Sequence, residues 1–76
     1  MYESIFKGKS QEEIETMLIE KAVQNFFDDG HETEDTIYNY FIEVYEDNDE
    51  EPDPDLLEKL AKEAKDALYE ARNGIR

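Results

Sequence analysis

Cysteine and tryptophan are missing from this chain of 76 residues, which contains only three glycines, two prolines and one histidine. Without cysteine the protein can form neither disulfides nor thiolate metal sites, and thiol catalysis is excluded. No apolar run is long enough to span a membrane, and the N-terminal residues lack the apolar core of a signal peptide. We therefore expect a soluble, cytoplasmic protein.

Residues that commonly catalyse reactions are also scarce. A nucleophile needs a neighbouring base that a third group holds in place, but His31 is the single histidine, and the few serines and threonines lie mostly where helices are expected to begin. The isolated glycines form no phosphate-binding loop. We interpret His31, between Gly30 and Glu32, as a polar residue in a turn rather than a metal ligand. The sequence predicts a binding protein without a cofactor, and not an enzyme.

Negative charge is present in excess and is unevenly distributed. The chain has 22 Asp and Glu residues against 8 Lys and Arg residues, and residues 31–55 contain eleven of the acids and none of the bases. Such a surface repels nucleic acid and anionic lipid and attracts basic partners. We therefore expect no direct binding to nucleic acid or membrane, and a basic protein as the partner.

The first of three amphipathic segments covers residues about 11–29. Ser10 and Glu13 have the spacing of a capping box, in which each side chain accepts a hydrogen bond from the other residue's backbone N–H. The apolar residues recur with helical spacing; they are Ile14, Met17, Leu18, Ala22, Val23, Phe26 and Phe27. Gly30 follows the last of them and is the expected left-handed cap.

A second clear helix is predicted over residues about 54–73. Asp53 is a good N-cap, and Pro54 occupies the first helical position, where its missing N–H does no harm. Gly74 ends the helical pattern. The apolar face consists of Leu57, Leu60, Ala61, Ala64, Leu68 and Ala71.

Residues 36–45, between these two segments, fit a helical stripe but also alternate like a strand. Thr33 as N-cap, followed by the acidic Glu34 and Asp35, favours a helix over about 34–46. We therefore predict one all-α domain, a compact three-helix bundle with an acidic connection at 46–55. The alternative is an α+β fold in which two helices pack on a hairpin made from residues 2–6 and 36–45.

Two regions leave their packing open. The N-terminal residues Tyr2, Ile5 and Phe6 are expected to form either a short strand or an arm packed on the core. Residues 36–45 contain more aromatic and large apolar side chains than one helix face needs, so they belong either to the core or to an interface. Because a core of this size without disulfides is marginal, we expect a homodimer whose interface avoids residues 46–55.

Residues 47–58 resemble a calcium-binding loop, because acids occupy positions 1, 3, 5, 7, 9 and 12 of the EF-hand pattern. However, Pro52 stands where that loop requires glycine, and Pro54 stands where it has an aliphatic residue. Carboxylates at these positions are also expected by chance in so acidic a segment. A divalent-cation site through 47–58 is therefore an alternative function and not the favoured one. For the whole acidic stretch of residues 31–55, the simplest interpretation is a solvated linker.

The favoured interpretation is that carboxylates take the place of DNA phosphates. Residues 46–55 hold seven acids; in an extended chain this gives about one charge per 5 Å, and acids at helical spacings of three and four residues lie about 5–6 Å apart. Either arrangement is near the charge spacing of a single nucleic-acid strand. The expected partner-binding residues are Glu32, Glu34, Asp35, Glu43, Glu46, Asp47, Asp49, Glu50, Glu51, Asp53 and Asp55.

In size, charge and lack of catalytic groups the chain resembles the small acidic DNA-mimic inhibitors that bacteriophages make against host DNA-binding proteins, including the nucleoid protein HU. The resemblance covers overall character and no motif, so it assigns no residue roles. It implies a protein, often dimeric, that competes with DNA in the host cytoplasm for a nucleoid-associated protein. An acidic immunity or antitoxin protein that neutralises a basic nuclease would have the same features and is a further alternative.

Overall fold

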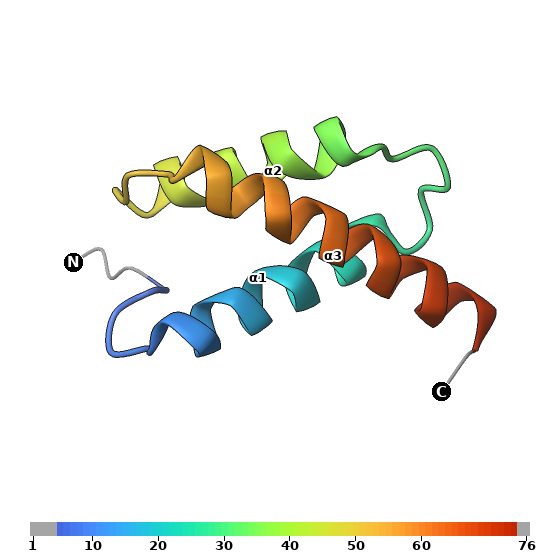
Figure 1. Cartoon of the computed structure of the whole chain (residues 1–76), viewed down its shortest axis with the longest axis horizontal. Coiled ribbons are helices and arrows are strands. Elements are labelled where there is room, and N and C mark those ends of the chain that lie inside the picture. Colours follow the sequence, from blue (N-terminus) through green and yellow to red (C-terminus); the bar gives the residue numbers. More distant parts are fainter. Residues whose placement is uncertain (1–4, 75–76) are drawn as a thin grey trace.

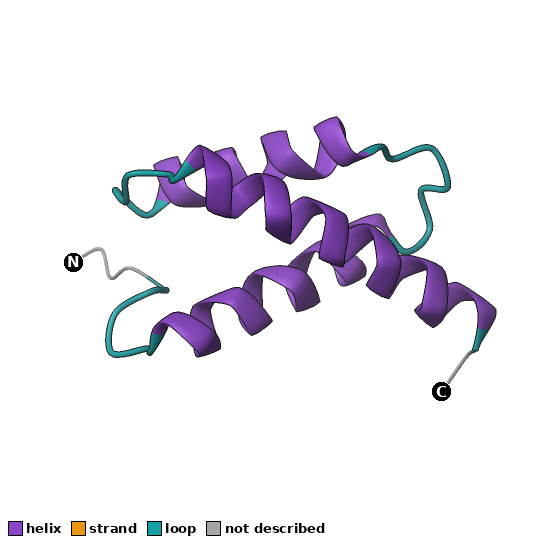
Figure 2. Cartoon of the chain, viewed as in Figure 1, coloured by secondary structure: helices purple, strands orange, loops and turns teal. Residues whose placement is uncertain are grey.

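The computed structural model describes residues 5–74, and this part of the chain contains three helices and no strand (Figure 2). The helices are α1 (Gln11–Phe26), α2 (Glu34–Asp47) and α3 (Pro54–Asn73). All three are in contact, and α3 lies across both α1 and α2 (Figure 1), which pack far more on α3 than on each other. The predicted three-helix bundle is confirmed, and the alternative with a hairpin is wrong.

The core forms where the apolar stripes of the three helices meet. In each helix the buried residues recur every three or four positions, as an amphipathic pattern requires. They are Leu18, Ala22 and Phe26 in α1, Ile37, Phe41 and Tyr45 in α2, and Leu57, Leu60, Ala61, Ala64 and Leu68 in α3. Two of the α3 residues are alanines, whose small side chains allow neighbouring helices to approach closely. Ala71, predicted to lie on the apolar face, is instead exposed because it lies near the end of α3.

Local hydrogen bonds fix the first turn of each helix where the sequence predicts it. The backbone N–H of Glu13 donates to Ser10 Oγ over 3.2 Å, and the N–H of Ser10 donates to Glu13 Oε1 over 2.9 Å, which completes the capping box. Thr33 Oγ1 accepts the N–H of Thr36 at the start of α2, at 3.2 Å. Asp53 caps α3 through its carboxylate, and Pro54 follows at the first helical position.

Helix α1 ends at Phe26, three residues before the predicted end, with Phe27 as its C-cap. Gly30 has the left-handed conformation that was expected, with φ of 82°, but it lies in the connection beyond the cap. The helix stops early because the carbonyl of Phe26 accepts the N–H of Asp29 at 3.0 Å, which closes a turn. The same carbonyl also accepts a side-chain donor from α3.

Helix α2 extends one residue beyond the predicted end and closes with a Schellman motif. The N–H of Glu50 donates to the carbonyl of Tyr45 at 2.9 Å, and the N–H of Asp49 donates to that of Glu46 at 3.2 Å. Asp49 occupies the left-handed position of this motif, with φ of 59°, where glycine is usual. The turn between α2 and α3 is therefore ordered by backbone hydrogen bonds.

The segment before α1 packs on the core as an arm. Phe6 is buried, and its ring lies 4.7 Å from the ring of Tyr45, centroid to centroid. The N–H of Ile5 donates to Oδ1 of the buried Asn48 at 2.9 Å, and Nδ2 of Asn48 donates to the carbonyl of Val44 at 2.8 Å. The arm is thus confirmed for residues 5–6, while Tyr2 lies outside the described residues.

Most large apolar side chains of residues 36–45 belong to the core. Ile37, Phe41 and Tyr45 are buried, and the others pack against them half-buried; these are Tyr38, Tyr40, Ile42 and Val44. Among the described residues, only Phe27 and Tyr69 are large apolar side chains that are exposed. The aromatic surplus is therefore used inside the bundle, and the homodimer stays a prediction.

Candidate functional site

The fold divides the predicted partner-binding acids between the two ends of α2. Glu34 and Asp35 lie in its first turn, and the helix of 14 residues is about 21 Å long. Glu32 lies just before this helix, and the other eight acids lie in its last two turns, in the following turn and at the start of α3, at the opposite end of the bundle from the α1–α2 connection (Figure 1). We call these eight residues the acidic end: Glu43, Glu46, Asp47, Asp49, Glu50, Glu51, Asp53 and Asp55.

The outer face of α2 continues the acidic end toward the start of the helix. At about 100° per residue, the exposed residues of this helix after Glu34 share an arc of about 120° opposite the buried stripe. They are Asp35, Thr36, Asn39, Glu43, Glu46 and Asp47. Four of the six are acids and none is a base, so this face is negative along its length.

All eight carboxylates of the acidic end are exposed, and within the described range none of them forms an ion pair. The carboxylate of Asp53 accepts the N–H of Asp55 at 3.2 Å as the cap of α3. The nearest bases along the chain are Lys21 in α1 and Lys59, one turn into α3. Because the carboxylates keep their charge uncompensated within the fold, this end presents a negative field to solvent.

The acidic end is a compact turn rather than an extended track. Glu46 and Asp47 are helical, Asp49 has the left-handed conformation, and Asp55 already belongs to α3. The extended arrangement considered for residues 46–55 is therefore wrong. Hydrogen bonds that close α2 and start α3 reverse the chain, and the carboxylates gather around this reversal.

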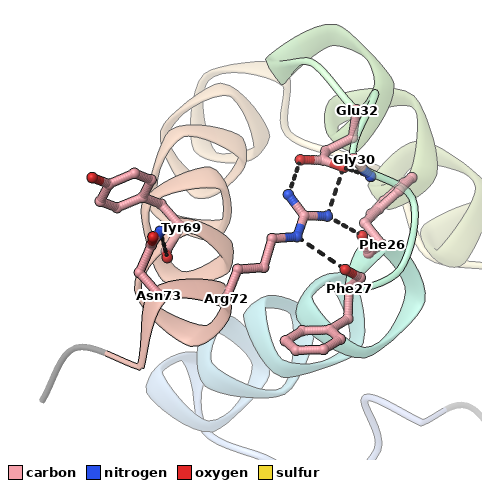
Figure 3. A network of polar contacts seen from close by, with 7 residues as sticks. All are labelled: Phe26, Phe27, Gly30, Glu32, Tyr69, Arg72 and Asn73. Carbon is pink, nitrogen blue, oxygen red and sulfur yellow. Dashed lines mark hydrogen bonds and ion pairs between the residues drawn. The ribbon is translucent and has the colours of Figure 1, made fainter.

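Glu32 differs from the other predicted residues because its carboxylate is bound within the fold. Arg72, in the last turn of α3, holds it with both ends of its guanidinium group: Nη1 donates to Oε2 at 2.7 Å, and Nη2 donates to Oε1 at 2.9 Å (Figure 3). The Glu32 side chain is only 6 % exposed. It is therefore not available to a partner, and we remove it from the candidate site.

The Arg72 contact also sets the charge of Glu32. The pKa of Glu32 is lowered from 4.5 to about 2, and the largest cause is the hydrogen bonding from Arg72. Burial is the next largest effect and acts in the opposite direction. The N–H of Gly30 donates to the same carboxylate at 3.2 Å. The hydrogen bond to Glu32 in turn raises the pKa of Arg72 above its ordinary value. Both groups are charged throughout the neutral range.

Arg72 also closes the C-terminus of α1, which has no basic residue of its own in its last turn. Its Nε donates to the carbonyl of Phe27 at 2.9 Å, and Nη2 donates to the carbonyl of Phe26 (Figure 3). A cation at this position satisfies carbonyls without helical partners and interacts favourably with the helix dipole. We call the contact of Arg72 with Glu32, Phe26 and Phe27 the Arg72 clasp.

This role of Arg72 was not predicted from the sequence. One signal was present: Arg72 is the sole arginine among the described residues, whose other bases are lysines. The planar fork of arginine suits a two-pronged bond to a carboxylate, which a lysine cannot form. The identity of the acid that it binds, forty positions away, could not be read from local spacing.

The calcium-loop interpretation of residues 47–58 requires carboxylates that converge on one point. Over residues 5–74, no group of three or more Asp, Glu or His side chains is arranged to hold a metal ion. Asp47 ends α2, Asp53 caps α3, and Glu58 lies inside α3, so the helical boundaries separate them. His31 is exposed in the α1–α2 connection, as predicted.

Comparison of the chain with models of protein families, with curated proteins and with solved structures finds no match. None of the helices in the described range is long and apolar enough to cross a membrane.

Proposed function

We propose that the protein is a DNA-mimic inhibitor, which occupies the basic nucleic-acid-binding surface of a DNA-binding protein with its acidic end and the outer face of α2. The observation that carries the proposal is the acidic end itself. Eight exposed carboxylates gather there within thirteen residues, and none forms an ion pair with another described residue. Carboxylates that the fold leaves uncompensated are available to the basic side chains of a partner.

The charge density of the α2 face supports the comparison with DNA. From Asp35 to Asp47 the helix axis advances about 18 Å and carries four exposed carboxylates on the outer arc. Over the same length, one strand of duplex DNA presents about five phosphates. The protein therefore offers a similar number of charges, concentrated toward the C-terminal end of the helix, where Glu43, Glu46 and Asp47 lie.

The carboxylates are also presented on an ordered support. Those of α2 and α3 project from packed helices, and those of the turn lie between a Schellman motif and the Asp53 cap. Ordering a flexible acidic tail would cost conformational entropy when it binds, whereas a preformed surface has already met that cost. A folded acidic end thus suits an inhibitor that has to compete with a rigid duplex.

Competition with DNA is the decisive test. The protein is used to capture partners from a bacterial lysate, and each basic protein that mass spectrometry identifies is then loaded with a fluorescent DNA duplex. Addition of the acidic protein is expected to release the duplex, which lowers its fluorescence anisotropy. The effect should weaken as salt rises, because exposed charges are screened beyond about 8 Å at physiological ionic strength. If the duplex stays bound while the acidic protein also binds, the protein is a non-competitive adaptor and the proposal fails.

A charge-matched pair of variants locates the effect. Replacing Glu46, Asp47, Asp49, Glu50 and Glu51 by the corresponding amides is expected to weaken DNA release at least about tenfold. The control replaces five exposed acids elsewhere, Glu12, Glu20, Glu63, Asp66 and Glu70, and has the same net charge. It should release DNA within about twofold of the native protein. Equal losses in both variants would mean that net charge alone acts, and would contradict a site at the acidic end.

A further inference from the structure

A groove opens at the acidic end, where the start of α1, the end of α2 and the start of α3 meet. Its volume is about 420 Å³. The apolar part of its wall comes from Phe6, Ile14, Tyr45 and Leu56. Three carboxylates of the acidic end, those of Glu50, Glu51 and Asp53, also line it.

The floor of the groove is aromatic and firmly held. The rings of Phe6 and Tyr45 pack against each other at 4.7 Å with an angle of 46° between their planes. Both side chains are buried, and Ile14 and Leu56 beside them are half-buried. Such a floor can contact the methylene stem of a long side chain.

The rim of the groove carries negative charge. Glu50, Glu51 and Asp53 are exposed, and within the described range none of them is in an ion pair. Their field reaches the floor: burial raises the pKa of the Tyr45 hydroxyl, and the charges of Asp53, Glu50 and Glu15 raise it further. An apolar floor below a carboxylate rim is complementary to a side chain that is apolar along its stem and positive at its end.

We propose that this groove binds a single arginine side chain of a basic partner protein, with the stem on the floor and the guanidinium group between the carboxylates of the rim. The inference rests on the proposed function, because it names the feature of the basic partner that the acidic end recognises. Arginine fits better than lysine because its planar group can bond two carboxylates at once and can lie against an aromatic ring, whereas an ammonium ion is compact and strongly hydrated.

Two other grooves of the bundle are less suited to a cation. The groove between the start of α2 and the first half of α3 contains Lys62 among the carboxylates of Glu34, Asp35 and Glu58, so a base of the protein itself already opposes a bound cation there. The groove around Tyr40, between α1 and α2, is lined mainly by uncharged side chains and has one carboxylate, that of Glu43.

The test measures binding of N-acetyl-arginine amide by nuclear magnetic resonance, with N-acetyl-lysine amide as a probe of equal charge. The arginine probe is expected to cause saturable shifts at the amides of Gln11, Glu51 and Leu56, and to bind several-fold more tightly than the lysine probe. Equal affinities for the two probes, or chemical shifts spread evenly along the outer face of α2, would mean that the probes bind only by nonspecific electrostatic attraction. Either result would overturn the inference.

A pair of uncharged substitutions checks that the groove itself is the site. Gln11 lines the groove and is exposed at the start of α1, so Gln11→Trp should fill the groove without changing the net charge. It is expected to weaken binding of the arginine probe at least about tenfold. Gln24→Trp makes the same change about 20 Å along α1, on another exposed position, and should leave binding unchanged. Unaltered binding in Gln11→Trp would overturn the inference.

The outcomes separate this inference from the proposed function. If the groove binds arginine selectively but the protein releases DNA from none of the captured partners, the arginine site is supported and the DNA-mimic function is contradicted. Conversely, the native protein and Gln11→Trp could release DNA equally well, and the two probes could bind with equal affinity. That result would support the DNA-mimic function and contradict an arginine site in the groove.

Discussion

The two ends of the bundle place acidic residues in opposite environments. At the end where α1 joins α2, Glu32 is 6 % exposed and its carboxylate is bound by Arg72 from α3. At the other end, where α2 joins α3, eight carboxylates are exposed and none has an ion-pair partner among the described residues. Both ends come from the same acidic stretch of sequence, residues 31–55.

The difference shows that the role of an acid depends on whether the fold brings a cation to it. Arg72 reaches Glu32 because α3 crosses α1 near the end of both helices, and the same side chain closes the last turn of α1 (Figure 3). Within residues 5–74 no base forms an ion pair with a carboxylate of the acidic end, so its charge remains available to a partner. Substitutions at the Arg72 clasp should therefore change stability, and substitutions at the acidic end should change binding.

The largest effect on stability is expected from Arg72→Met. The substitution removes four hydrogen bonds and leaves the nearly buried carboxylate of Glu32 without a cation. The midpoint of thermal unfolding should fall by about 10 °C or more, as followed by circular dichroism at 222 nm. The control is Lys65→Met, which removes an exposed base from the same helix and should shift the midpoint by less than about 3 °C. Equal shifts of the unfolding midpoint in the two variants would mean that the Arg72 clasp makes no specific contribution to stability.

A pH dependence of intermediate size should come from Glu32. Its pKa is about 2 in the folded protein and 4.5 as the ordinary value, so the folded state favours the ionised form. The stability that the clasp supplies is therefore fully present above about pH 4.5 and is lost as the pH falls toward 2. Urea unfolding of the native protein and of Glu32→Gln should show a difference in free energy that is constant at neutral pH and narrows across this window. A difference that stays constant down to pH 2 would contradict the folded-state ion pair.

The smallest effect, and one of opposite sign, is expected from Asp49→Gly at the acidic end. Asp49 has a φ of 59°, a conformation that costs a residue with a side chain more than it costs glycine. The substitution should stabilise the protein by about 0.5–1 kcal/mol in urea unfolding. Asp49→Asn removes the same charge but keeps a side chain, and should stabilise it less. Both variants should lose the same amount of DNA release; a difference in release would show that the geometry of the turn, and not its charge, governs binding.

Helix starts could be predicted from the sequence because each one depends on residues that are at most three positions apart. Ser10 bonds Glu13, Thr33 bonds the N–H of Thr36, and Asp53 precedes a proline. Such contacts form within a single turn of chain, whatever the rest of the molecule does. The C-terminus of α3 is equally local, since Gly74 takes the left-handed conformation and closes it.

The end of α1 and the division of the acidic surface could not be predicted in this way. Gly30 indicated a helix that ends at about residue 29, but Arg72, 46 positions after Phe26, binds the carbonyl at which the helix actually ends. Likewise, nothing in the sequence distinguishes Glu32 from the acids of residues 46–55. Among the described residues, Glu32 forms an ion pair and those acids do not, because only Glu32 lies next to Arg72 in the folded chain.

The sequence by itself determined helices α1 and α3, the residues at which all three helices start, most of the apolar stripe of each helix and the location of the charge along the chain. These features follow from short-range hydrogen bonds and from the spacing of apolar residues, which any folded form of the chain would share. The tertiary structure alone decided which acid is bound by a base, and that an aromatic floor lies below the carboxylates of Glu50, Glu51 and Asp53. Both depend on contacts between segments about forty residues apart, because Arg72 meets Glu32 and Phe6 meets Tyr45 only when the helices pack.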